Sequence, residues 1–179
     1  DRKIDAVNPR TAGRELAAGA LSLKQGYGVA LCGVVLYFIA CAGLGEFVLT
    51  LSLFPLIPLT IYSLLKRFTP LCHYGIGVAL GFAPLGAFVA ASGDLAFSSE
   101  LILLCLFTFF WISGFDIIYA LMDREFDQTH GVKSLPSALG EKGALAVAAF
   151  THLIAFALLV LLWMGFGGAL SLLSLSVAA

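Results

Sequence analysis

Three aspartates at the end of an apolar segment are the clearest chemical signal in the chain. Asp116, Asp123 and Asp127 are separated by seven and four residues. On a continuous α-helix that turns about 100° per residue, the later two would lie within about 20° of the direction of the first. The carboxylates would then share one face, with Asp116 roughly 10 Å deeper than Asp123. Because ionisable groups at membrane depth are costly and mark functional sites, we expect this face to bind a divalent cation and a multiply charged anion.

A second pair of aspartates repeats part of this pattern. Asp1–Asp5 and Asp123–Asp127 share the form Asp-Arg-x-x-Asp, and a polar loop that contains glycine follows each. Carboxylates four residues apart on a helix repel by a few tenths of a kcal/mol. Magnesium reverses this effect, since it binds one or two carboxylates and keeps positions for water and substrate phosphates. The repeat predicts a duplicated helical bundle whose two motifs face each other across a cavity and hold magnesium on both sides of one diphosphate.

Basic residues near the aspartates are the candidate protein contacts for this anion. They are Arg14, Lys66, Arg67 and Lys133. Arginine makes bidentate contacts with phosphate or carboxylate, whereas lysine supplies a point charge. A diphosphate leaves an allylic carbon more easily when cations hold its developing charge. The residues therefore favour a site that binds a diphosphate through metal ions and basic side chains.

The composition places these residues in an integral membrane protein. Hydrophobic residues make up 60% of the chain, charged residues 12%, and the mean hydropathy is +1.01. A soluble domain of this length could not bury so much apolar surface. There is no basic stripe, so nucleic-acid binding is not expected. The four cysteines occur singly, without the spacing of a disulfide framework or a zinc site.

Uncharged runs predict an all-α, multi-pass transmembrane bundle. They are Gln25–Gly45, Phe47–Leu65, Leu71–Gly93, Leu101–Phe115 with its extension Ile117–Met122, and Gly143–Ala179. The fourth run reaches the ~20 residues of a spanning helix only if Asp116 lies inside it. Gly165–Gly168 divides the last run, which gives five spanning helices and the start of a sixth. The charged opening and the unflanked final run suggest a fragment of a longer protein, cut at both ends.

Helix-breaking residues refine this reading. Pro9 and Gly13 predict a loop after Asp5. Pro55, Pro58 and Pro84 lie inside predicted spans, where membrane helices tolerate proline. We expect them to kink these helices.

The distribution of charge predicts the orientation. With five spanning helices, one face receives all ten basic residues: Arg2, Lys3, Arg10, Arg14, Lys24, Lys66, Arg67, Arg124, Lys133 and Lys142. The opposite face carries only Glu46, Asp94 and Glu100. Because loops rich in lysine and arginine remain cytoplasmic, the aspartate motifs should face the cytoplasm, here of a bacterial inner membrane.

Three segments resemble a known family. Phe115–Asp127 with Gly131–Ser134 resembles the second aspartate motif of the UbiA superfamily of intramembrane prenyltransferases. The stretch from Asp1 to Leu16 resembles the end of the first motif and its loop, and Tyr62–Thr69 resembles the basic segment between the motifs. The order is that of the family, and the match covers essentially the whole chain. The 4-hydroxybenzoate polyprenyltransferases and their menaquinone-pathway relatives are the most similar subgroup.

The resemblance implies a single UbiA-type transmembrane domain over residues 1–179, truncated at both ends. It implies magnesium-dependent transfer of a polyprenyl group from polyprenyl diphosphate to an aromatic acceptor in quinone biosynthesis, through an allyl cation and within the lipid bilayer. The implied magnesium ligands are Asp1, Asp5, Asp123 and Asp127. The implied contacts of the diphosphate or the acceptor are Lys66, Arg67, Lys133 and Arg14. The implied catalytic residues are Asp116, Tyr119 and Arg67, and residues of Leu71–Gly93 and Leu101–Phe115 could line the prenyl tail.

Other functions remain open at this point. The same family includes prenyltransferases for a menaquinone precursor, haem or lipid acceptors. An ion transporter would also use intramembrane aspartates, but its acids should be spread through the depth of several helices. A CDP-alcohol phosphotransferase would need an Asp-Gly pair followed by Ala-Arg, which neither aspartate motif has. His73, His130 and His152 receive little weight, and we expect His152 to be hydrogen-bonded to a neighbour.

Overall fold

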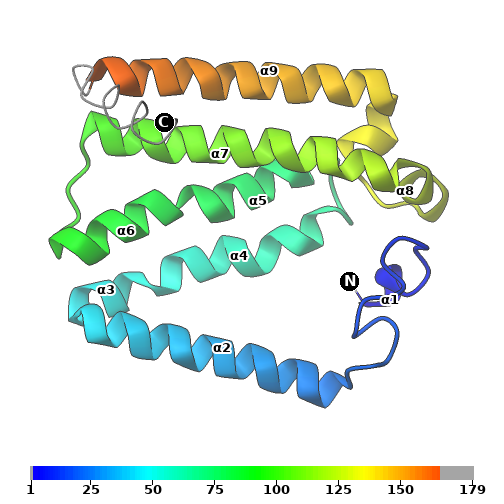
Figure 1. Ribbon diagram of the computed structural model, residues 1–179, viewed down its shortest axis with the longest axis horizontal. Coiled ribbons are helices and arrows are strands. Elements are labelled where there is room, and N and C mark those ends of the chain that lie inside the picture. The colour runs from blue at the N-terminus through cyan, green and yellow to red at the C-terminus, as the bar shows by residue number, and fades with distance from the viewer. Residues whose placement is uncertain (1, 166–179) are drawn as a thin grey trace, which may run out of the picture. The chain divides into compact units, whose positions relative to one another are not determined.

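Helices and their connecting loops make up the part of the chain that the structure describes. The structure is a computed structural model, and it describes residues 2–165. In chain order (Figure 1), its elements are α1 (Arg2–Asp5), α2 (Leu23–Leu44), α3 (Glu46–Leu51), α4 (Leu53–Leu65), α5 (Cys72–Gly81), α6 (Ala83–Ser92), α7 (Ser99–Ala120), the 3₁₀ turn η1 (Leu121–Asp123), α8 (Arg124–His130) and α9 (Leu135–Gly165).

Five stretches of residues 2–165 are long and apolar enough to cross a membrane. They are Leu23–Leu44, Glu46–Leu65, Cys72–Ser92, Ser99–His130 and Leu135–Gly165. The predicted all-α, multi-pass class and the five spans are therefore confirmed, and Asp116 lies inside α7 as expected. The predicted start of a sixth helix lies outside the described residues.

Local sequence explains where the helices begin and end. Ser22 begins α2 with a capping box, in which its hydroxyl accepts from the Gln25 backbone N–H and the Gln25 side chain accepts from the Ser22 N–H. Ser98 caps α7 by accepting from the Leu101 N–H at 3.2 Å. Gly131 ends α8 with a φ of 68°, a left-handed conformation that favours glycine.

The second and third spans are interrupted close to prolines, as predicted. The second span is interrupted at Ser52, three residues before Pro55, and Pro58 lies inside α4. The third span is interrupted at Phe82, between Gly81 and Pro84. Proline lacks the N–H that would continue the hydrogen-bond ladder, so each helix is interrupted just before the proline, which then lies in the first turn of the next helix.

The last described helix differs from the prediction. It begins at Leu135, eight residues before the predicted Gly143, and it kinks at Gly140, where φ is 70° and ψ is 178°. The prediction from uncharged residues placed this start too late because Glu141 and Lys142 lie in the first turns of the helix. Their side chains lie at the polar end of the helix, where charge does not prevent helix formation.

The chain divides into two compact units, Asp1–Leu53 and Phe54–Ala179. In the first unit, α1 ends at Asp5 and turns follow through Pro9 and Gly13, which confirms the predicted loop. The α2 helix packs against α3, and the Tyr37 hydroxyl donates to the Ser52 carbonyl at 2.8 Å. Most apolar side chains of α2 are exposed, as expected for a surface that faces lipid.

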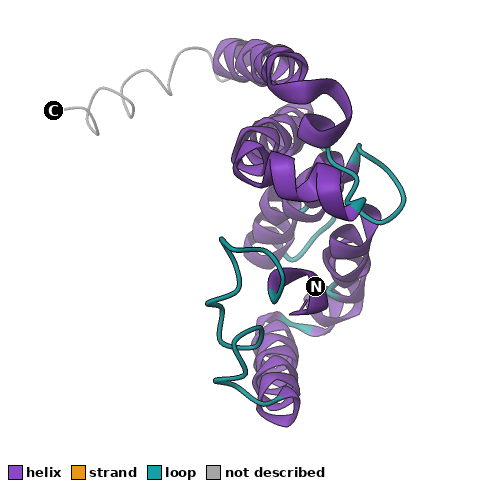
Figure 2. Ribbon diagram, turned by 90° about the vertical axis from the view of Figure 1, so that its right-hand side faces the viewer, coloured by secondary structure: helices purple, strands orange, loops and turns teal. Residues whose placement is uncertain are grey.

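In the second unit, α7 lies between α5 and α9 (Figures 1 and 2). Glycines permit this close packing: a Cβ at Gly77 of α5 would contact Ser113 of α7, and one at Gly114 would lie 2.6 Å from a ring atom of His152. The side chain of Ile117 is fully buried in the core between these helices. The unit therefore holds α7, which carries Asp116, between two closely packed helices.

Candidate functional site

The predicted face of three aspartates is not carried by one continuous helix. The α-helix that contains Asp116 ends at Ala120, and the 3₁₀ turn η1 ends at Asp123 before α8 carries Asp127. A 3₁₀ turn has 3.0 residues per turn rather than 3.6, so it changes the angular relation of the residues on its two sides. The sequence spacing alone therefore does not place the three carboxylates, and their positions depend on what each contacts.

Asp116 is fixed by a histidine from another helix. Its Oδ2 lies 2.7 Å from Nδ1 of His73, the second residue of α5. His73 is buried, with 3% of its side chain exposed, whereas 34% of the Asp116 side chain is exposed. The carboxylate thus has one side toward a buried partner and another side accessible. The sequence analysis gave His73 little weight, and the residue spacing contains no signal for this pair.

Asp127 is held by the beginning of α9. The Ser134 hydroxyl donates to Asp127 Oδ2 at 2.8 Å, and both residues are buried. Asp127 is also close enough to Asp123 and Lys66 for their charges to act on its carboxylate. The second aspartate motif and the basic segment therefore meet in one place, and Ser134 is a further contributor that the sequence analysis placed only inside a motif.

Backbone hydrogen bonds join the loop after α4 to the loop before α9. The Lys133 N–H donates to the Lys66 carbonyl at 2.8 Å, and the Lys133 ammonium donates to the Phe68 carbonyl at 3.1 Å. A cavity of about 510 Å³ lies between these loops, and Asp127 and Lys133 are among its lining residues. Since an ammonium has three N–H donors, Lys133 can bind an anion while it keeps this contact.

The same contacts test one part of the predicted topology. Lys66 and Lys133 come from two basic loops that the sequence analysis assigned to one face, and the hydrogen bond between their backbones confirms that these loops share an end of the second unit. Glu100 lies at the other end of α7, near Gly165 at the end of α9. The cytoplasmic orientation itself stays a prediction.

The other predicted site residues are placed as follows. Tyr119 is 43% exposed, and Arg67 is exposed in the loop after α4. In the first unit, Arg14 Nη1 donates to both carboxylate oxygens of Asp5, at 3.1 and 3.2 Å. Arg14 therefore neutralises a predicted magnesium ligand. Asp1 lies outside the described residues, so the facing of the two aspartate motifs stays a prediction.

The carboxylates fit magnesium better than a metal that needs a complete protein cage. Within residues 2–165, no group of three or more His, Cys, Asp or Glu side chains converges as a metal site. Magnesium needs only one or two carboxylates, because waters and substrate phosphates supply its other ligands. Asp123 and Asp127, beside the positive charge of Lys66, suit that kind of shared coordination.

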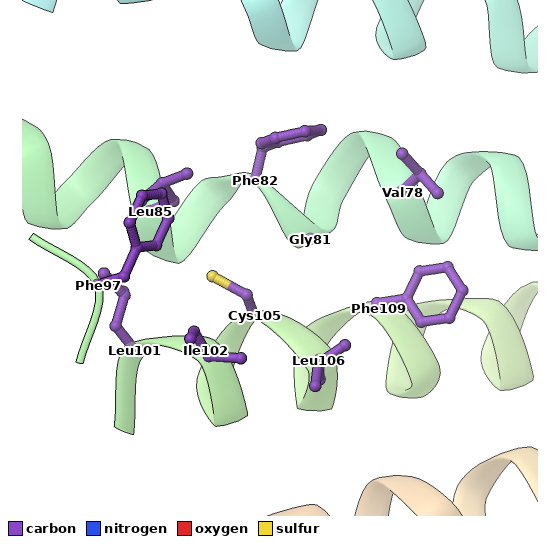
Figure 3. Close-up of a pocket in the computed structure, with 10 residues that line it drawn as sticks. All are labelled: Val78, Gly81, Phe82, Leu85, Phe97, Leu101, Ile102, Cys105, Leu106 and Phe109. Carbon is purple, nitrogen blue, oxygen red and sulfur yellow. The ribbon is translucent and has the colours of Figure 1, made fainter. Parts of the chain in front are cut away.

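Apolar cavities lie in the predicted tail-lining segments. One of about 290 Å³ lies between α5–α6 and α7 (Figure 3), and its lining residues are Val78, Gly81, Phe82, Leu85, Phe97, Leu101, Ile102, Cys105, Leu106 and Phe109. In the close-up, Phe82 and Leu85 come from one side and Cys105 and Phe109 from the other. A second cavity of about 350 Å³ lies between α4 and α5–α6 and includes Tyr62, about one helical turn before Lys66.

Comparison with known proteins decides the family. The model of the UbiA prenyltransferase family matches residues 1–179. The chain belongs to this family. Its family and its five candidate spans together make it an integral membrane protein.

Relatives within the UbiA family support the assignment. A 4-hydroxybenzoate solanesyltransferase from Synechocystis is 37% identical over 84% of this chain and 51% of its own length. A 4-hydroxybenzoate octaprenyltransferase from Tolumonas auensis is 33% identical over 83% of this chain and 51% of its own length. The chain spans about half the length of the curated relatives that it matches.

A solved UbiA structure also has the same fold. The apo structure of a UbiA homologue from Aeropyrum pernix K1 matches with a TM-score of 0.88 and 39% identity, covering 99% of this chain and 67% of that chain. The resemblance inferred from the aspartate and basic motifs is therefore confirmed at the level of family and fold.

The remaining histidines have structural contacts. His152 Nδ1 donates to the Ala148 carbonyl at 2.9 Å, as expected for a hydrogen bond to a neighbour, and its ring packs edge-on against Trp111. His130 stacks on Phe126 in the last turn of α8. Of the three histidines, His73 is the one bonded to a predicted site residue.

Proposed function

We propose that the full-length protein is a magnesium-dependent polyprenyltransferase that transfers a polyprenyl group from its diphosphate to an aromatic acceptor such as 4-hydroxybenzoate. The observation that carries this proposal is the hydrogen bond between Lys133 N–H and the Lys66 carbonyl. It joins the loop of the second aspartate motif to the basic segment, so that carboxylates and cations occur together at one end of the helices. The activities of the curated relatives support the choice of acceptor.

In this proposal, the protein's cations hold the diphosphate. Lys66, Arg67 and Lys133 bind its oxygens, and Arg14 is a further candidate contact. Asp123, Asp127, Asp1 and Asp5 are the residues that would hold magnesium. When bound, magnesium neutralises part of the negative charge on the diphosphate.

The reaction then proceeds by departure of the leaving group. The allylic C–O bond breaks, and its electron pair leaves with the diphosphate. A carbon of the electron-rich ring attacks the allyl cation, a C–C bond forms, and the ring releases its proton to water. Asp116 and Tyr119 border the reacting carbons, where the negative charge of Asp116 stabilises the cation.

The prenyl tail lies in an apolar environment. The cavity between α5–α6 and α7 and the cavity beside Tyr62 supply apolar walls for it. Burial of each methylene contributes about 0.8 kcal/mol, so a long tail is strongly favoured there over water. The acidic group of the acceptor pairs with a cation of the basic segment.

The proposal is tested with the full-length protein in membranes. Radiolabelled polyprenyl diphosphate is supplied with 4-hydroxybenzoate, in magnesium or in EDTA, and labelled product is separated from diphosphate. We expect product only with magnesium. Magnesium-dependent release of diphosphate without product would keep the reaction class and change the acceptor, whereas product that persists in EDTA would contradict the metal requirement.

A serine that contacts Asp127 provides a further prediction. Ser134→Ala removes the hydroxyl that donates to Asp127 Oδ2, so we expect the magnesium concentration for half-maximal rate to rise about tenfold. Ser134→Thr retains the hydroxyl and is the matched control, with a magnesium requirement near that of the wild type. An unchanged magnesium requirement in Ser134→Ala would show that Ser134 does not support the metal ligand.

A further inference from the structure

His73 connects three elements of the second unit at the depth of Asp116. It lies at the beginning of α5, its Nδ1 is 2.7 Å from Asp116 Oδ2 on α7, and its Nε2 is 3.2 Å from the backbone nitrogen of Leu135 at the beginning of α9. Both ring nitrogens are therefore engaged, and the ring is buried with 3% of its side chain exposed. Such a ring cannot rotate without losing two hydrogen bonds.

The two partners determine which nitrogen carries the proton. A backbone N–H can only donate, so Nε2 must offer its lone pair to Leu135. The proton of a neutral imidazole then resides on Nδ1, which donates to Asp116 Oδ2. The pair consequently contains a neutral histidine and a negatively charged carboxylate, and the negative charge near the reacting carbons is retained.

The carboxylate is tethered on one side only. Asp116 Oδ2 accepts from His73, whereas Oδ1 accepts no hydrogen bond from the described part of the chain. With 34% of its side chain exposed, Asp116 can direct Oδ1 toward a substrate while Oδ2 remains fixed. Without the tether, the carboxylate could rotate about its side-chain bonds, and its charge would no longer lie at one defined position.

We propose that His73 is a positioning residue that holds Asp116 in one orientation for the prenyl-transfer reaction, and that the Leu135 N–H fixes the histidine tautomer needed for this role. The expected effect on rate rests on the proposed function. The hydrogen bonds of His73 to Asp116 and Leu135 do not depend on that function. His73 contacts the reaction only through Asp116. It should therefore influence the turnover of bound substrate more than the binding of the diphosphate.

A double-mutant cycle in the full-length protein tests the coupling. We expect His73→Leu to lower kcat about 100-fold with KM for the polyprenyl diphosphate nearly unchanged, because small misplacements of a reacting group cost about this much. In an Asp116→Asn background, His73→Leu should lower kcat less than about threefold, because the carboxylate that it positions is already gone. If His73→Leu costs the same factor in both backgrounds, the inference is overturned.

Matched variants separate positioning from packing. His73→Asn keeps an N–H donor close to the place of Nδ1, and we expect its kcat to recover to within about tenfold of wild type. His152→Leu removes another helix histidine that contacts Trp111 and Ala148, and it should leave kcat within about twofold. If His73→Asn is as slow as His73→Leu, hydrogen bonding to Asp116 is not the role of His73.

A spectroscopic measurement tests the geometry independently of activity. Nitrogen-15 NMR of histidine-labelled full-length protein in nanodiscs, assigned by the signal lost in His73→Asn, should show His73 protonated at Nδ1 and unprotonated at Nε2. A proton on Nε2 would overturn the inference. If the wild type releases no diphosphate at all, the proposed function fails and the tautomer alone decides whether His73 holds Asp116.

Discussion

Asp123→Asn is expected to lower kcat for prenyl transfer about 1000-fold, the largest effect predicted for a single residue of the second motif. The substitution keeps the size of the side chain and removes its negative charge. In the proposed site Asp123 acts together with Asp127, and it lies close enough for its charge to act on the Asp127 carboxylate. Loss of one of two neighbouring carboxylates would remove much of the affinity for magnesium, and the departing diphosphate would lose its main source of neutralisation.

The measurement is the rate of labelled product formation across a magnesium titration, with EDTA as the zero point. The residual rate of Asp123→Asn should depend little on magnesium, and it should approach the rate of the wild type in EDTA. An acid at the other end of the helices supplies the control: Asp94→Asn can still accept from the Leu95 N–H, and it should retain the wild-type rate. A magnesium-dependent rate near that of the wild type in Asp123→Asn would exclude this carboxylate as a metal ligand.

Gly77→Ala is expected to have the largest effect on stability. An added Cβ would contact the Ser113 side chain and lie 2.7 Å from the Phe109 carbonyl oxygen, so it meets a backbone atom of α7 that cannot move alone. Overpacking of this kind costs about 1–3 kcal/mol. Because α5 carries His73 and α7 carries Asp116, a displacement of the two helices should also lower kcat.

Thermal unfolding of the purified full-length protein measures the effect, with the transfer rate as a second readout. Gly86→Ala is the matched control, because Gly86 is also inside a helix and an added Cβ there meets nothing within 4 Å. We expect a lower melting temperature for Gly77→Ala and an unchanged or slightly higher one for Gly86→Ala. Equal melting temperatures for the two variants would show that α5 and α7 do not depend on close approach at Gly77.

Much of the fold follows from the sequence because hydropathy is a local property. An apolar run of about 20 residues must form a spanning helix, since the bilayer leaves no other partner for its backbone groups. The five spans and the inclusion of Asp116 in the fourth were predicted on this basis and are confirmed. The ends were predicted less well, as at α9, because charged residues can occupy the first turns of a helix outside the apolar region.

The motifs in the sequence also indicated the family, because the chemistry of a site requires particular residue types at particular spacings. They identified the residues of the second motif and the basic segment, and the contact between Lys66 and Lys133 agrees with the shared face inferred from charge. They did not determine how the carboxylates are oriented. The turn η1 interrupts the helix on which their common face was predicted.

Only the tertiary structure showed what holds those carboxylates. His73 and Asp116 are 43 residues apart, and Leu135 is 62 residues from His73. A lone histidine at the beginning of an apolar helix has no spacing pattern that predicts a partner. Its contacts exist because glycines let α5 pack closely on α7 and because α9 begins beside them. The sequence by itself determined which segments can span the membrane and which residues are candidates for the chemistry, because both depend on residue type and near neighbours. Helix packing decided how the side chains are oriented, because orientation depends on contacts between residues that are distant in the chain.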